Sequence, residues 1–270
     1  MASYEKWSKR IKENLSKYKV ETLKIVENGV WKKNKKQYSH ILPIEYGELN
    51  YLCDYAKNAL AEDEKHSDWN HLNSSQTMCV NFFAPLRKIE NGRYLDLLIS
   101  HILKKDVSIK ESCFEYVPKE KSTNFDFYVK DKSDGQYFFE IKYTEQDIAK
   151  SGGGKCPFNA YKAFYSEDVE SNPAFINVDK DMFMKKHYQA YRNMVKGKGN
   201  DYSFFITMKG NKGTFKELQS ALNDLCVESV PNVIALYWEE LIDDVIALFK
   251  DNKELTDYYK KFKRKYTCND

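Results

Sequence analysis

The chain has 270 residues, of which 42% are hydrophobic and 31% charged, and its formal net charge is +3 at pH 7. This apolar content permits a sizeable core, and no run approaches the ~20 apolar residues that span a membrane. The six cysteines form no Cys-x-x-Cys pair, which argues against a zinc site or a disulfide framework. The N-terminus lacks the apolar segment of a signal peptide, so we expect a cytoplasmic protein.

The first part of the chain reads as mainly helical. Apolar residues with a helical period predict helices over residues 3–18, 45–65 and 94–104. Ser74 and Ser75 are candidate N-caps of a further helix, and Pro85 is expected to end it because proline disfavours helical backbone before it. A Gly- and Lys-rich stretch lies at residues 28–38.

Strands and helices alternate along the rest of the chain. The expected strands are residues 112–117, 125–130, 136–143, 202–208 and 233–238, and the expected helices are residues 179–196, 215–226, 239–249 and the C-terminal end. The sequence Ser-Gly-Gly-Gly at residues 151–154 predicts a flexible break.

Residues 124–143 are the most informative segment. Two aromatic and β-branched runs flank a short polar turn, which predicts a β-hairpin. If Lys130 pairs with Gln136, then Asp126 lies directly opposite Glu140. A register slip of one residue would put Asp126 on the wrong face of the sheet.

Lys142 joins this acidic pair, because alternate side chains of a strand share a face and Glu140 lies two residues before it. Carboxylates this close raise each other's pKa, and a divalent cation between them favours their ionised form. Oxygen ligands that leave positions for water and phosphate suit Mg²⁺, with Mn²⁺ as a substitute. The alternative is a cross-strand ion pair on a solvated face, which the spacing alone does not exclude.

The pattern acidic–any–Lys occurs at three places, but only Glu140-Ile141-Lys142 interrupts an apolar strand and has an acidic residue in a partner strand. This arrangement resembles the PD-(D/E)xK nuclease superfamily, although Phe125 stands where the superfamily name has proline. The resemblance implies that Asp126, Glu140 and Lys142 are catalytic. It also implies that the two carboxylates hold the metal and that the backbone carbonyl of Ile141 reaches it.

A longer resemblance covers much of the chain. The motifs Tyr38-Ser-His-Ile-Leu-Pro43, His71-Leu-Asn-Ser-Ser-Gln76, Asn81-Phe-Phe-Ala-Pro-Leu86, Glu140-Ile-Lys-Tyr-Thr-Glu145 and Tyr191-Arg-Asn193 are similar, in this order, to a family of bacterial proteins described as restriction endonucleases. It implies an α/β (α+β) restriction-endonuclease-like core, a central mixed β-sheet flanked by helices, with N-terminal and C-terminal helical additions. We expect a single nuclease domain over 1–270, with an N-terminal helical region at 1–90, the nuclease core at 94–240 and C-terminal helices at 241–270.

Three other residues are candidates for supporting roles. Glu115 is an acidic residue in an apolar strand, where it would be either a further metal ligand or an edge residue facing water. Gln189 and Arg192 lie on the helix after the Glu-x-Lys strand, and the planar guanidinium of Arg192 suits phosphate. For both of them, the polar face of an amphipathic helix is the alternative.

Several basic stretches could contact a nucleic acid, since lysines neutralise phosphates without reading sequence. They are Lys6–Lys19, Trp31–Lys36 with Lys32, Lys33, Lys35 and Lys36, and Tyr258–Tyr266. Lys155 follows the glycine run of residues 151–154. This run lacks the GxxxxGK[ST] spacing of a phosphate loop, and it fits better as a mobile loop beside the site, in which Lys155 could contact a DNA backbone. For each stretch alone, a solvated helix face is the usual reading.

The sequence therefore predicts a Mg²⁺-dependent endodeoxyribonuclease of the bacterial cytoplasm, with double-stranded DNA as partner, no membrane association, and compatibility with a homodimer. One alternative is a DNA-binding protein of the same fold without cleavage activity. Another is a related phosphodiester enzyme that acts on RNA or on branched or repair intermediates.

Overall fold

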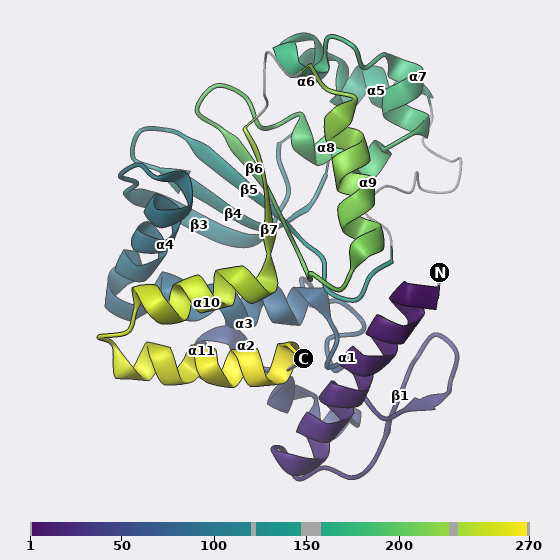
Figure 1. The fold of residues 1–270 in the computed structure, drawn as a ribbon, viewed down its shortest axis with the longest axis vertical. Helices are drawn as coiled ribbons and strands as arrows, with labels where there is room; N and C mark the ends of the chain where they lie inside the picture. The colour runs from purple at the N-terminus through teal and green to yellow at the C-terminus, as the bar shows by residue number, and fades with distance from the viewer. Residues whose placement is uncertain (1, 120–122, 147–157, 227–231, 269–270) are drawn as a thin grey trace. The chain divides into compact units, whose positions relative to one another are not determined.

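The structure is a computed structural model, and it describes residues 2–119, 123–146, 158–226 and 232–268. The chain forms two compact units, which Figure 1 shows with their helices and strands labelled. The first unit is Met1–Ser108 with Tyr237–Asp270, and the second is Ile109–Leu236. Within the described part of the chain, every helix is too short or too polar to cross a membrane. The assignment of residues 94–240 as a nuclease core stays a prediction.

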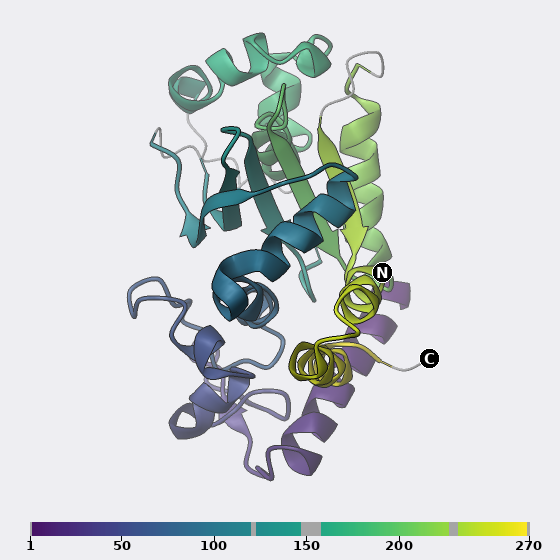
Figure 2. The same ribbon diagram turned by 90° about the vertical axis from the view of Figure 1, so that its left-hand side faces the viewer.

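The first unit is mainly helical, as the sequence predicts. Its elements are α1 (Ala2–Glu21), β1 (Gly29–Val30), β2 (Gln37–Tyr38), η1 (Ile44–Asn50), α2 (Asp54–Lys57), α3 (Ser75–Lys88), η2 (Ile89–Gly92), α4 (Arg93–Leu103), α10 (Trp238–Leu248) and α11 (Lys253–Tyr266). Figure 2 views α10 and α11 nearly end-on, as neighbours. Phe82 of α3 lies at the centre of this unit, because its ring packs edge-on against Trp238 at 5.1 Å and Tyr259 at 5.4 Å.

Helix α3 begins as predicted but does not end at Pro85. The side chain of Ser74 caps it by accepting a hydrogen bond from the backbone of Thr77. Proline has no N–H to donate to the carbonyl one turn earlier, which is that of Asn81. The hydroxyl of Tyr258 on α11 donates to this carbonyl instead, at 2.6 Å. The helix can therefore continue to its last residue, three positions beyond the proline.

The helix predicted over residues 45–65 is also wrong, because only η1 and the four-residue α2 form there. Long-range hydrogen bonds replace the local ones. The side chain of Asn81 accepts from the backbone of Leu52 at 2.8 Å, and the side chain of Asn50 donates to the carbonyl of His71 at 2.8 Å. These tertiary contacts outweigh the helical period of the segment.

The second unit contains the sheet. Its elements are β3 (Ile109–Tyr116), β4 (Phe125–Asp131), β5 (Gln136–Ile141), α5 (Phe158–Phe164), α6 (Ser166–Glu170), η3 (Pro173–Phe175), α7 (Lys180–Lys185), α8 (Tyr188–Met194), β6 (Tyr202–Thr207), α9 (Lys212–Asn223) and β7 (Val233–Tyr237). The described residues form a five-stranded sheet in the order β3-β4-β5-β6-β7. The first three strands pair antiparallel and β5 pairs parallel with β6, so the sheet is mixed. This is the fold class that the sequence predicts.

Helices α8 and α9 cover one face of this sheet, as Figure 1 shows. Their buried residues cluster with Phe205 of β6 and with two residues of β7. Phe205 lies beside Glu140 in the parallel register, so this is also the face of the predicted acidic pair. The opposite face carries an aromatic layer, in which Phe139 stacks on Phe204 at 4.4 Å.

The helix predicted over residues 179–196 is broken into α7 and α8. The break falls at Lys186 and His187, where the backbone of His187 has φ −132° and ψ 43°. Both side chains turn toward Asp224 at the end of α9: the Lys186 ammonium lies 2.7 Å from its carboxylate and the His187 ring 3.6 Å. The break starts α8 along the sheet face that carries Glu140.

Candidate active site

The β4–β5 hairpin has the predicted register. Lys130 pairs with Gln136, and the ladder continues to Phe127 opposite Phe139. One further step along the same register brings Asp126 opposite Glu140, as the sequence predicts.

The tight turn of the hairpin explains this register. The carboxylate of Asp131 accepts hydrogen bonds from the backbone of Ser133 and of Gly135, both at 2.8 Å. A short polar side chain that bonds its own turn is typical of an Asx turn. Asp134 takes a left-handed backbone with φ 66°, a conformation that aspartate tolerates better than most residues. The turn therefore fixes the loop length, and with it which residues face each other.

Glu115 occupies the corresponding position on the next strand. Each pair from Glu111–Lys130 to Tyr116–Phe125 follows one register, which puts Glu115 opposite Asp126. The backbone of Glu115 is left-handed, with φ 50°, so the strand is irregular at this residue. Its carboxylate accepts a 2.6 Å hydrogen bond from the side chain of Asn124. Acidic residues therefore hold equivalent positions on three adjacent strands.

Both oxygens of the Glu140 carboxylate have partners, and the residue is only 7% exposed. The Lys142 ammonium lies 2.6 Å from Oε1. The side-chain amide of Asn193 on α8 donates to Oε2 at 2.7 Å. Asn193 is held in turn, because its Oδ1 accepts a 3.1 Å hydrogen bond from Thr123. The carboxylate is therefore fixed in orientation by residues of both the sheet and the helix that covers it.

Asp126 lies beside this group and is electrostatically strained. Its Oδ2 accepts a 2.6 Å hydrogen bond from the backbone N–H of Ile141. Burial raises the pKa of the Asp126 carboxyl well above its usual range, and the charge of Glu140 raises it further. The Lys142 ammonium and the Ile141 amide lower this pKa only in part. The site thus has a deficit of positive charge when both carboxylates are ionised.

The surroundings of Lys142 favour its charged form. Burial alone would lower the pKa of its ammonium, but the carboxylates of Glu140, Asp126 and Glu145 outweigh burial and raise the pKa above its ordinary value. Its ammonium therefore carries a positive charge and donates hydrogen bonds at neutral pH.

Two carboxylates on one sheet face suit a hard cation that keeps most of its water ligands, as Mg²⁺ does. Burial and the charge of Glu140 together raise the pKa of Asp126, and this favours a cation here, because a positive charge would stabilise the ionised carboxylates. Among the described residues, no group of three or more His, Cys, Asp or Glu side chains is arranged to hold a metal ion. A cation at this position would therefore have two carboxylates, those of Asp126 and Glu140, and otherwise water.

The helix residues predicted to support the site lie on α8. Gln189 is one turn before Asn193 on the same helix face, and Arg192 is adjacent. The Arg192 guanidinium lies over the ring of Tyr188, 5.8 Å from its centroid. Asn193 is not among the residues predicted from the sequence, although Ala190 and Met194 mark the buried face of this helix. A buried asparagine on that face was the available signal.

The predicted DNA-binding lysines fall in two places. Lys32, Lys33, Lys35 and Lys36 are exposed in the loop that joins β1 and β2 in the first unit. The Lys33 ammonium lies 6.0 Å from the ring centroid of Trp31. Lys155 lies outside the described residues, as do residues 151–154.

A hollow of about 530 Å³ opens on the same sheet face as the acidic pair. It is lined by Tyr128 and Phe138, each two residues along its strand from Asp126 or Glu140, and by Tyr116. Lys196 and Lys198 also line it, and Asp168 pairs with both at 2.6 and 3.1 Å. The candidate site thus continues along the strands into a concave surface with aromatic and basic side chains.

Comparison of the sequence with known proteins gives one result that bears on this site. A family model described as "Restriction Endonuclease associating with ARP" matches residues 12–267. No curated protein and no solved structure matches the chain. The matched segment includes both units and every described candidate site residue.

Proposed function

The chain belongs to the family of restriction endonucleases associating with ARP, and we propose that it is a Mg²⁺-dependent endonuclease of the PD-(D/E)xK type that hydrolyses DNA phosphodiester bonds. The observation that carries the proposal is the position of Asp126 opposite Glu140, with the Lys142 ammonium 2.6 Å from Glu140. Family membership supports a nuclease. The acidic pair supports the metal dependence and the reaction type.

Each residue has a distinct part in the proposed site. Asp126 and Glu140 would hold the cation, and the carbonyl of Ile141 would add a third oxygen. A bound Mg²⁺ would polarise the phosphate and lower the pKa of a coordinated water. Asn193 keeps one oxygen of Glu140 engaged, which orients the other toward Lys142 and the cation.

Lys142 acts through its charge. Because the pKa of its ammonium is raised, the residue donates hydrogen bonds and stabilises negative charge that develops on the phosphate and the attacking water. Water is the nucleophile, and the protein forms no covalent bond to the substrate. The hollow along the strands, with Tyr116, Tyr128 and Phe138, gives space for the nucleotide next to the cleaved bond.

The test is nicking of supercoiled plasmid by the purified protein, with Mg²⁺ or with EDTA. The wild type should convert the plasmid to nicked or linear forms only with Mg²⁺, and Glu140→Gln should lose this activity. Asp134→Asn is the matched control, because Asp134 is on the same hairpin but exposed, and its carboxylate forms an ion pair of 3.0 Å with Lys130. Undiminished nicking by Glu140→Gln would place the activity elsewhere or in a contaminant.

A further inference from the structure

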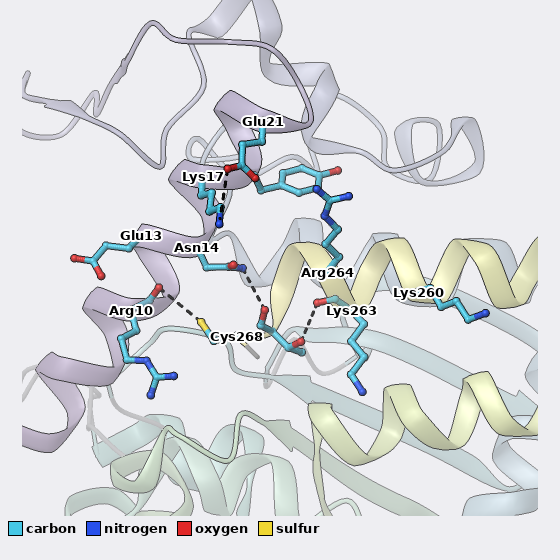
Figure 3. Close-up of a pocket in the computed structure, with 11 residues that line it drawn as sticks. Arg10, Glu13, Asn14, Lys17, Glu21, Lys260, Lys263, Arg264 and Cys268 are labelled. Atoms are coloured by element: carbon cyan, nitrogen blue, oxygen red, sulfur yellow. Dashed lines mark hydrogen bonds and ion pairs between the residues drawn. The ribbon is translucent and has the colours of Figure 1, made fainter. Parts of the chain in front are cut away.

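Helices α1 and α11 lie side by side, although they stand at opposite ends of the sequence. The side chain of Asn14 donates to the carbonyls of Lys265 and Thr267, both at 3.2 Å. The thiol of Cys268 contacts the carbonyl of Arg10, with 3.7 Å between sulfur and oxygen. Between the two helices is a groove of about 680 Å³, shown in Figure 3. We call it the α1–α11 groove.

The groove is basic. Among the described residues that line it, Arg10, Lys17, Lys260, Lys263 and Arg264 are basic, and Glu13 and Glu21 are acidic. Figure 3 shows the first two basic residues on α1 and the other three on α11. The sequence contains the two basic stretches 6–19 and 258–266, and the fold places them on two sides of one concave surface.

Part of this positive charge is not neutralised by the protein. Lys17 pairs with Glu21 at 3.7 Å, and Lys263 pairs with Asp243. Lys260 and Arg264 are exposed and form no ion pair with any described residue. These two charges at the α11 side of the groove therefore have no ion-pair partner among the described residues, although the charge of Lys260 also acts on Asp257.

Tyr18 lines the same groove and is 4% exposed. Burial raises the pKa of its hydroxyl to about 12, and the nearby charge of Arg264 opposes this increase. The guanidinium of Arg264 is thus close to the inner wall of the groove, where an anion between the helices would meet it.

We propose that the α1–α11 groove binds the phosphodiester backbone of DNA, as a surface separate from the catalytic carboxylates. The choice of DNA over other polyanions rests on the proposed function. Arg10 and Lys17 are seven residues apart, which is about 10 Å along a helix. Phosphates of one DNA strand follow each other every ~3.4 Å along the duplex axis, so the groove spans about three of them. The guanidinium groups suit phosphate because they donate two parallel hydrogen bonds.

The experiment measures binding of a labelled 30-base-pair duplex by the full chain carrying Glu140→Gln, with Ca²⁺, over a range of salt concentrations. The test variant adds Lys260→Glu and Arg264→Glu. The control adds Lys253→Glu and Lys261→Glu, which change the same charge at exposed positions of the same helix outside the groove. Thermal unfolding checks that each variant is folded.

We expect the test variant to bind the duplex about tenfold or more weakly, and its slope of log affinity against log salt to become less steep by about two, from a loss of two phosphate contacts. The control should keep both values nearly unchanged. Equal weakening of the two variants, or no weakening of either, would overturn the proposal. The proposal would also be overturned if the groove substitutions left duplex binding unchanged but weakened binding of poly-glutamate. That result would assign the groove to an acidic protein.

The duplex-binding measurement does not depend on catalysis. If the wild-type protein does not nick plasmid with Mg²⁺ but the groove substitutions still weaken duplex binding, the proposed nuclease function fails and the groove proposal stands. If nicking depends on Glu140 but duplex binding ignores the groove, only the groove proposal fails.

Discussion

The side-chain amide of Asn193 on α8 donates a 2.7 Å hydrogen bond to Oε2 of Glu140 on β5. The carbonyl of Asn193 also accepts a 2.6 Å hydrogen bond from the side chain of Ser203 on β6. The residue thus ties the covering helix to two neighbouring strands, and it orients one oxygen of the proposed catalytic carboxylate. A metal ligand whose second oxygen is held in this way loses little freedom when a cation binds.

Replacing Asn193 should weaken metal binding and leave the fold intact. In Asn193→Ala, Glu140 keeps its ion pair with Lys142 but loses the donor that orients it. We expect the Mg²⁺ concentration for half-maximal nicking to rise by about 10- to 100-fold, in line with other residues that support a metal ligand. The measurement is a Mg²⁺ titration of plasmid nicking.

The matched control is Asn172→Ala, because Asn172 is also buried and its side chain donates to the backbone of Val195 at 3.1 Å. This variant should lose stability but keep the Mg²⁺ dependence. An equal change in both variants would assign Asn193 a purely structural role.

Asp126→Asn should stabilise the metal-free protein at neutral pH. The pKa of Asp126 is raised in the folded state, so this state holds its proton at pH values where the unfolded chain, with a pKa near ~3.9, has released it. The wild type therefore loses stability as the pH rises from about 4 through the folded-state pKa of Asp126. Above that pKa, the stability lost by ionising Asp126 has reached its full value. The asparagine oxygen can still accept the hydrogen bond from Ile141.

The measurement is thermal unfolding in EDTA across pH 4 to 8. We expect a higher Tm for Asp126→Asn than for the wild type at neutral pH, by about 2–4 °C for each kcal/mol gained in the free energy of unfolding. Toward pH 4, the Tm values of the two proteins should become similar. Addition of Mg²⁺ should raise the Tm of the wild type more than that of the variant. A variant less stable than the wild type throughout would contradict the electrostatic strain inferred at this site.

The hairpin was predictable because its rules are local. A short turn sets the register, and alternation along the strands then fixes which side chains share a face. The placement of Asp126, Glu140 and Lys142 on one sheet face could therefore be predicted from their spacing. The position of Asn193 was not predictable in this way. It depends on the break at His187, which tertiary contacts with Asp224 hold.

Long-range contacts also explain the errors in the helices. Pro85 stops a helix only if no other group donates a hydrogen bond to the carbonyl of Asn81. Here the donor is Tyr258, far along the chain.

The α1–α11 groove also depends on long-range contacts. Each basic stretch alone reads as a solvated face, and only the packing of Asn14 against the end of α11 puts them on one surface.

Tyr258→Phe tests the contact that lets α3 continue past Pro85. The substitution leaves the carbonyl of Asn81 without its donor in a partly buried position. An unsatisfied polar group of this kind costs about 1–3 kcal/mol. Chemical denaturation should show that loss in the free energy of unfolding. Tyr55→Phe, at an exposed tyrosine, is the control and should change stability by less than about 0.5 kcal/mol. Equal stability of the two variants would remove the role given to Tyr258.

Charge reversal of Lys32, Lys33, Lys35 and Lys36 tests whether the loop between β1 and β2 contacts the DNA backbone. Lysines that contact phosphates bind all sequences alike. The variant with all four Lys→Glu substitutions should therefore weaken binding to every duplex by a similar factor, without changing any preference between sequences. Each lost phosphate contact should make the slope of log affinity against log salt less steep by about 0.9. Binding to several unrelated duplexes in Ca²⁺, at three or more salt concentrations, measures both effects. A control that reverses the exposed Lys24, Lys88, Lys104 and Lys250 changes the same total charge elsewhere in the same unit, outside the basic stretches named above. If the control weakens binding as much as the loop variant, net charge is responsible and the loop makes no specific contact.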